Sequence, residues 1–149
     1  MVLGAAVISL AACGSSGRFD GPVAMRTAAD GIEFALCAGA EATEIRVEQR
    51  NPRLGQDWVT IWWAVGEHTF ELGDIVGLNA EVDGFDTRVF ETPDIQEGTE
   101  LVVSLVRDTS PPTSIIADFE PLGSGLLPEG DWLHPDGSLT TAPCEDGST

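Results

Sequence analysis

The sequence predicts an all-β protein, an antiparallel β-sandwich of seven or eight strands. Apolar and polar residues alternate along several short runs, and turn-forming pairs of Asn, Asp, Gly and Pro separate these runs. No apolar stripe at helical spacing extends over more than about two turns. Many short strands joined by regular turns are typical of two packed antiparallel sheets.

The clearest strand is "ATEIRVEQR", in which charged residues alternate with Ile45 and Val47. The runs "TELVVSLV" and "SIIADFE" alternate in the same way, with Leu101, Val103, Leu105, Ile115, Ala117 and Phe119 expected to face the core. Further strands are expected at about 31–38, 68–72, 74–78 and 86–91. Turn chemistry at Asn51-Pro52, Asp83-Gly84, Glu97-Gly98, Pro111-Pro112 and Pro135-Asp136-Gly137 separates them.

The run "WVTIWWAV" is also expected to be a strand. Its alternation predicts that Val59, Ile61, Trp63 and Val65 face the core and that Trp58, Thr60, Trp62 and Ala64 face outward. Two outward Trp residues four positions apart would stand about 13 Å from each other along the strand. Exposed aromatic side chains stack on sugars or seat a partner, so Trp58 and Trp62 are the candidate ligand-binding residues. The alternative is that the tail, around Trp132-Leu133, covers this face.

The charge of the chain excludes one class of partner. The 149 residues, enough for one domain of ordinary size, include 25 acidic residues against seven basic ones, and the formal net charge is −18. Such a surface repels phosphate backbones, so we expect no binding to nucleic acid.

The amino-terminal run from Val2 to Leu10 is apolar but far shorter than the roughly 20 residues that a membrane-spanning helix needs. It has the length of the apolar region of a signal peptide and ends at small residues. Leu10-Ala11-Ala12-Cys13 resembles the lipobox of bacterial lipoproteins, and the following Gly14-Ser15-Ser16-Gly17 resembles their polar tether. Because no Lys or Arg precedes the run, either the natural start lies a few codons upstream, which we favour, or the terminal amine alone supplies the positive charge of the signal peptide.

This resemblance implies that residues 1–12 are a lipoprotein signal peptide and that Cys13 is the first residue of the mature protein, acylated on its thiol and amine with groups such as palmitate. Residues 13–30 would form the lipidated Cys and a flexible tether, and residues 31–149 the β-sandwich. Acyl chains would hold the protein in the lipid bilayer, on the extracytoplasmic face of the cell membrane.

Cys37 and Cys144 are the two remaining cysteines, an even pair in a chain expected to be exported. We expect a disulfide between them. Two free buried thiols or a metal site are the alternatives, and the metal site lacks a C-x-x-C and any His close to either Cys in the sequence.

No catalytic motif is present, and neither a cofactor nor a metal site is expected. His68 and His134 are isolated from each other, and the sequence contains no G-x-S-x-G, P-loop or H-E-x-x-H. Asn79, Glu81, Asp83 and Gly84 are similar to the first half of an EF-hand loop, but Phe90 occupies the position of the chelating Glu. A tight turn at Asp83-Gly84 is the preferred interpretation.

The segment "EGTELVVSL" is similar to the later strands of fibronectin type III and immunoglobulin-like domains, which implies an immunoglobulin-like sandwich and nothing about function. Together these expectations describe a membrane-anchored envelope lipoprotein that displays an acidic β-sandwich as a binding or structural module. Its partner would be a cell-wall glycan or an envelope protein. The alternative is a small envelope hydrolase whose site is built from dispersed residues, which would require a His within reach of a Ser or a carboxylate.

Overall fold

The computed structural model describes residues 22–109, 113–119 and 129–144, and these residues are almost entirely strands and turns. The elements are β1 (Val23–Ala28), β2 (Gly31–Leu36), β3 (Ala40–Arg50), the short 3-10 turn η1 (Pro52–Leu54), β4 (Val59–Phe70), β5 (Ile75–Gly77), β6 (Phe85–Phe90), β7 (Glu100–Arg107), β8 (Thr113–Phe119), β9 (Trp132–Leu133) and β10 (Leu139–Thr140). Within the described ranges η1 is the only helical element, so the expected all-β class is confirmed.

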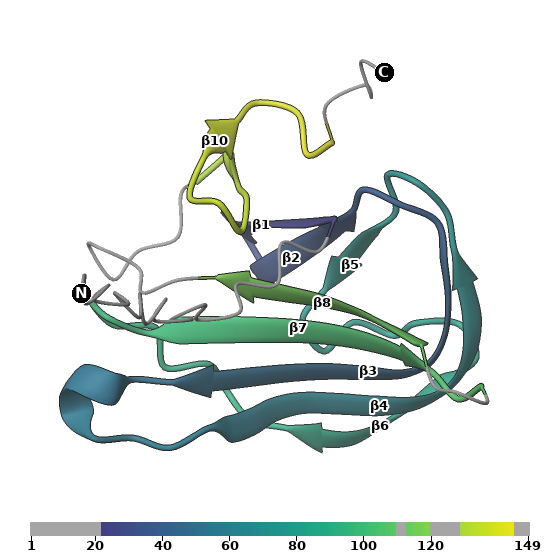
Figure 1. Cartoon of the computed structure of the whole chain (residues 1–149), viewed down its shortest axis with the longest axis horizontal. Helices are drawn as coiled ribbons and strands as arrows, with labels where there is room; N and C mark the ends of the chain where they lie inside the picture. The colour runs from purple at the N-terminus through teal and green to yellow at the C-terminus, as the bar shows by residue number, and fades with distance from the viewer. Residues whose placement is uncertain (1–21, 110–112, 120–128, 145–149) are drawn as a thin grey trace, which may run out of the picture.

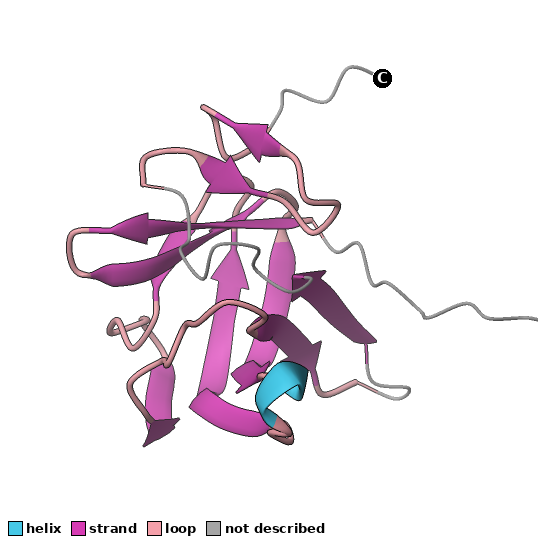
Figure 2. Ribbon diagram, turned by 90° about the vertical axis from the view of Figure 1, so that its left-hand side faces the viewer, coloured by secondary structure: helices cyan, strands magenta, loops and turns pink. Residues whose placement is uncertain are grey.

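The strands form two antiparallel sheets of five strands each. The β3 sheet has the order β6-β4-β3-β7-β8, and the β1 sheet has the order β10-β9-β1-β2-β5. The β1 sheet lies above the β3 sheet in Figure 1, where β3, β4 and β7 run along the long axis. Figure 2 is turned by 90° from Figure 1, and the β1–β2 hairpin is seen at full length in it. The strands of the β1 sheet therefore run in a different direction from β3, β4 and β7, which run along the horizontal axis of Figure 1. The two sheets therefore form the expected β-sandwich, with ten strands in the described residues where seven or eight were expected.

The core lies between the sheets. From the β3 sheet, the predicted inward residues Ile45, Val47, Leu101, Val103, Leu105, Ala117 and Phe119 are all buried, and Ile115 packs against them. From the β1 sheet, Val23, Met25, Ile32, Phe34 and Leu36 face them. Period-2 alternation therefore located the inner faces of β3, β7 and β8 correctly, because each of these strands has one wet face and one dry face.

The folded domain begins earlier than the sequence suggested. Residues 23–28 were expected to belong to the flexible tether, yet they form β1, which pairs with β2 along its whole length. Val23, Ala24 and Met25 are buried. The sequence of this segment shows no alternation of apolar and polar residues, so it did not indicate a strand. β1 is a central strand of its sheet, and both of its faces are covered, which favours small and apolar residues.

A β-bulge in β4 makes the orientation of its tryptophans differ from the one expected from the sequence. Val47 pairs with Trp62 whereas the next residue, Glu48, pairs with Thr60, so Ile61 is an extra residue in β4. One extra residue moves every later side chain of the strand to the opposite face. The expected outward position of Trp62 is therefore wrong: its side chain is 1% exposed and belongs to the core.

The bulge also reverses the faces on which the residues after Trp62 lie. Ala64, expected outside, is buried, while Trp63 and Val65, expected inside, pair with Arg46 and Glu44 on the outer face and are half-buried. The two strands expected at 58–65 and 68–72 are one continuous strand, since β4 runs to Phe70.

The carboxyl-terminal hairpin, β9 and β10, extends the β1 sheet beside β1, and its Trp132 side chain covers part of the outer face of that sheet. Trp132 of β9 packs with Ala24 and Ala35 in a small second cluster. The expected disulfide is confirmed: Cys37, just after β2, is bonded to Cys144, with their Cα atoms 5.2 Å apart. The tail therefore covers β1 and β2, and not the outer face of β4.

Candidate functional site

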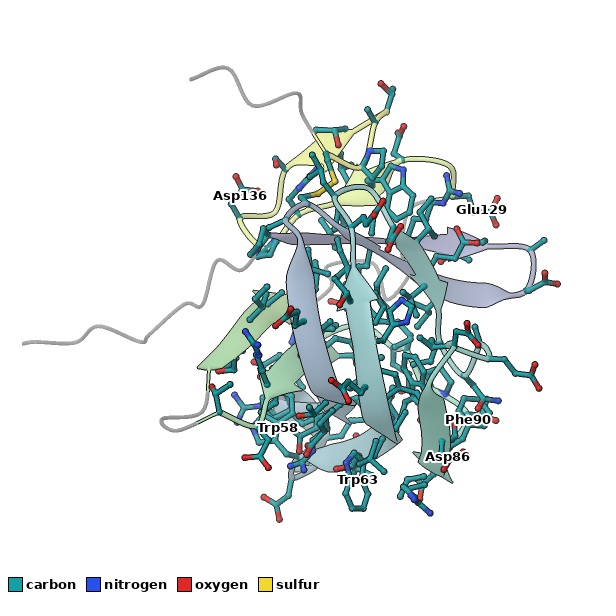
Figure 3. All side chains as sticks on the ribbon, turned by 90° about the vertical axis from the view of Figure 1, so that its right-hand side faces the viewer. Trp58, Trp63, Asp86, Phe90, Glu129 and Asp136 are labelled. Atoms are coloured by element: carbon teal, nitrogen blue, oxygen red, sulfur yellow. A yellow bond between two sulfur atoms is a disulfide. The ribbon has the colours of Figure 1, made fainter. Side chains whose placement is uncertain are left out.

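The outer face of the β3 sheet carries two tryptophans, Trp58 and Trp63, in place of the expected Trp58 and Trp62. Trp58, just before β4, is 39% exposed, and Trp63 is half-buried. Figure 3 shows Trp63 pointing out of the molecule on the side away from the β1 sheet. Because two consecutive residues of a strand face opposite sides, the pair Trp62-Trp63 places one indole on each face whichever way the strand is oriented.

Each of these tryptophans lies beside an arginine of β3. The guanidinium carbon of Arg50 lies 4.5 Å from the ring centroid of Trp58, and that of Arg46 lies 5.7 Å from the ring centroid of Trp63. Both distances are within the range of cation–π attraction. Arg46 and Arg50 are four residues apart on one face of β3, so the two Trp–Arg pairs are separated by about 13 Å along the strand.

The arginines of this face are neutralised by carboxylates. Arg46 forms an ion pair of 2.6 Å with Glu44, and Arg50 pairs with Glu100 of β7. Each arginine that borders a tryptophan of this face is therefore paired with a carboxylate. Such a surface suits a neutral, hydroxyl-rich or mixed polar partner better than a polyanion.

Trp63 has an unusual polar group. Its indole nitrogen is buried and has no hydrogen-bond partner among the described residues. Trp62, by contrast, directs its indole nitrogen toward the hydroxyl oxygen of Thr87 at 3.4 Å. An unpaired buried donor is unfavourable, so packing alone would favour an apolar side chain at position 63.

Trp62 borders a pocket on the inner side of the same strand. The pocket has a volume of about 400 Å³ and is lined by Trp62, Ala64, Asn79, Ala80, Glu81, Val82, Phe85, Asp86 and Thr87. A smaller pocket of about 210 Å³ lies across the same loop and is lined by His68, Phe70, Asp74, Ile75, Val76, Gly77, Ala80, Glu81, Val82 and Asp83. The loop between β5 and β6 therefore stands between two concave surfaces at the open edge of the sandwich.

Within the described part of the chain, each histidine makes a local contact, one in the β9–β10 hairpin and one with an aromatic ring. The Nε2 atom of His134 lies 2.7 Å from the hydroxyl oxygen of Thr140, but this hydroxyl donates its proton to the carbonyl oxygen of Ala142 at 2.5 Å. Thr140 therefore accepts from His134, and the contact closes the β9–β10 hairpin. His68 packs edge-on against the ring of Phe70.

The EF-hand-like segment is a turn followed by a strand. The backbone NH of Phe85 donates to the carbonyl of Val82 at 3.0 Å, and Gly84 has a positive φ of 81°. Residues 85–90 then form β6. Within the described part of the chain, no three His, Cys, Asp or Glu side chains are grouped so that they could hold a metal ion.

Residues 1–21, including Cys13 and the lipobox, lie outside the described residues. Among the helices of the described part, none is long and apolar enough to cross a membrane. No family model, curated protein or solved structure matches this chain. The class that the fold defines is an acidic, all-β sandwich domain closed by one disulfide between its second strand and its tail.

Proposed function

We propose that this protein is a lipoprotein of the bacterial cell envelope, anchored through acylated Cys13, and that its β-sandwich is a binding module. The anchor rests on Leu10-Ala11-Ala12-Cys13 at the end of a short apolar run. Two acyl chains hold a protein on a bilayer firmly, whereas one does so only marginally. The nine residues from Gly14 to Pro22 would separate the acylated Cys13 from β1.

The observation that carries the binding role is the outer face of the β3 sheet, with Trp58 and Trp63 each beside an arginine. Trp58 is substantially exposed, and the unpaired indole NH of Trp63 supports a use for that side chain other than stabilisation. We propose a neutral segment of a cell-wall glycan as the partner, because indole rings stack on the apolar faces of sugars and both arginines beside these rings are already paired with carboxylates.

The anchor is tested by expressing the full chain and the Cys13→Ser variant in a bacterium with lipoprotein processing. The native chain should sediment with membranes and show an acylated Cys13 at its amino terminus by mass spectrometry. The variant should be released from the membrane or remain as an uncut precursor. An unmodified Cys13, or a mature protein that begins elsewhere, would refute the anchor.

The binding face is tested with the lipidated full chain in detergent micelles, by co-sedimentation with insoluble peptidoglycan. Trp63→Ala and Trp58→Ala should each reduce the bound fraction severalfold. Leu72→Ala is the matched control, because Leu72 is 68% exposed and lies in the β4–β5 connection. Equal retention of all four proteins would rule out this face as the glycan-binding surface.

A further inference from the structure

The basic residues of this chain are few, and those in the described residues are already paired. The chain contains no Lys, and its seven basic residues are all Arg. Six of them lie in the described residues, and each forms an ion pair with a carboxylate: Arg26, Arg46, Arg50, Arg53, Arg88 and Arg107. Because the chain has 25 acidic residues, most of its carboxylates have no basic side chain left to pair with.

The carboxylates of the domain lie at its surface and are not gathered at one place. Among the described residues, the buried polar side chains are those of Asn51 and Thr99, and no carboxylate is buried. Asp86, Glu129 and Asp136 project from three separate parts of the domain in Figure 3. Because the carboxylates contact solvent, the charges that no Arg balances are screened by dissolved cations.

Salt weakens both the attraction within ion pairs and the repulsion between carboxylates. Exposed ion pairs contribute little to stability, and in the pairs of Arg53, Arg88 and Arg107 both side chains are about half exposed or more. A net charge of −18 opposes compaction, because folding brings all of the charges closer together. The Debye length falls from about 30 Å in 0.01 M salt to about 3 Å in 1 M salt. Added salt therefore removes more repulsion than attraction.

We propose that the ionic strength of the medium controls the folded state of this domain, which loses stability in dilute buffer and regains it as the salt concentration approaches about 1 M. The controlling feature is the unbalanced charge of the whole surface, so no cation site is needed. Within the described residues, no three metal-ligating side chains are grouped together. Neither Trp58 nor Trp63 takes part, so this property and the glycan-binding role can fail independently.

The test is thermal unfolding of the full chain in a neutral detergent, followed by far-ultraviolet circular dichroism at neutral pH. Between about 0.02 M and about 1 M NaCl, the unfolding midpoint should rise by about 10 °C or more. Sodium thiocyanate is the matched salt, because it has the same ionic strength as NaCl but does not strengthen the burial of apolar groups. At about 0.2 M the two salts should raise the midpoint equally, since screening depends on ionic strength alone.

Two fourfold variants separate the effect of charge from that of side-chain shape. Both replace four exposed glutamates that form no ion pair among the described residues: Glu67, Glu71, Glu81 and Glu91. The variant with Glu→Gln at all four positions should unfold at a higher temperature in dilute buffer, and its salt-dependent rise should be smaller by about a third to a half. The variant with Glu→Asp at the same positions keeps the charge and should keep the full rise.

Four results would overturn the proposal. A midpoint that moves by less than about 3 °C over the whole NaCl range would show that the repulsion is negligible. A rise in NaCl with a fall in equal, low concentrations of thiocyanate would assign the effect to apolar burial. The same salt response in the two fourfold variants would show that carboxylate charge is not its cause. A full rise in about 1 mM CaCl₂ would replace screening by a bound metal ion.

Discussion

The guanidinium carbon of Arg26 lies 4.3 Å from the ring centroid of Trp132, although 106 residues separate them in the chain. Arg26 is held in place by Glu33 of the neighbouring strand, through an ion pair of 2.9 Å. Trp132 packs with Ala24 and Ala35. The β9–β10 hairpin is therefore part of the folded domain and covers residues that would otherwise be exposed.

We expect Trp132→Ala to lower the free energy of unfolding by about 3–5 kcal/mol, the usual cost of removing a large buried aromatic side chain. Trp132 is 2% exposed. Leu139→Ala, in the same hairpin but 57% exposed, should change it by about 0.5 kcal/mol or less. Urea unfolding followed by circular dichroism measures both. Similar values for the two variants would contradict the packing described here.

Removal of the disulfide should loosen the tail before the rest of the domain. The bond joins residues 107 apart, and loss of a bridge in a domain of this kind costs about 2–5 kcal/mol. In the Cys37→Ser/Cys144→Ser variant, we expect amide hydrogen exchange to increase first at residues 132–140, while β3 and β7 stay protected. Uniform loss of protection would show that the bridge stabilises the whole sandwich as one unit.

The bulge at Ile61 predicts opposite roles for two adjacent tryptophans. Trp62→Ala should lower the free energy of unfolding by about 3–5 kcal/mol, since the side chain is buried in the core. Trp63→Ala should cost less than half as much, because this side chain is half-buried on the outer face. Thermal unfolding of the two variants decides between this register and a strand without the bulge, for which the order would be reversed.

Gly66 and Gly84 allow β4 and β6 to approach closely. A Cβ atom on Gly66 would overlap the carbonyl oxygen of Gly84, a backbone atom that cannot move aside cheaply. Gly66→Ala should therefore destabilise the domain by about 1–3 kcal/mol. Gly39→Ala is the control, because a Cβ there would lie 3.5 Å from the nearest atom. A neutral Gly66→Ala would show that the two strands can separate without cost.

The sequence allowed the sandwich class and most of its long strands to be predicted. In β3, β7 and β8, one face is polar and the other is apolar, so apolar and polar residues alternate in the sequence. This alternation predicts which side chains face the core. The pairing of Cys37 with Cys144 could be predicted because the chain has three cysteines and Cys13 was assigned to the lipobox. The turn at Asp83-Gly84 was also recognised, since Gly there accommodates a positive φ.

What could not be predicted depends on contacts distant in sequence. β1 was taken for a tether because it is dry on both faces only after Trp132 covers one of them. The two-residue strands β9 and β10 are too short to show any period. The outer tryptophan was misassigned because a bulge leaves no local signature: Ile61 is a good strand residue with or without it.

The connectivity of the sandwich also governs how quickly it can assemble. The central strand β3 pairs with β7, so Val47 lies opposite Val103, and Thr27 bridges to Glu129. These pairings close large loops, and domains dominated by such distant contacts fold over milliseconds to seconds. The β3 sheet is complete only when its last strand, β8, has joined it, and until then the apolar sides of β3 and β4 remain open to association with other chains.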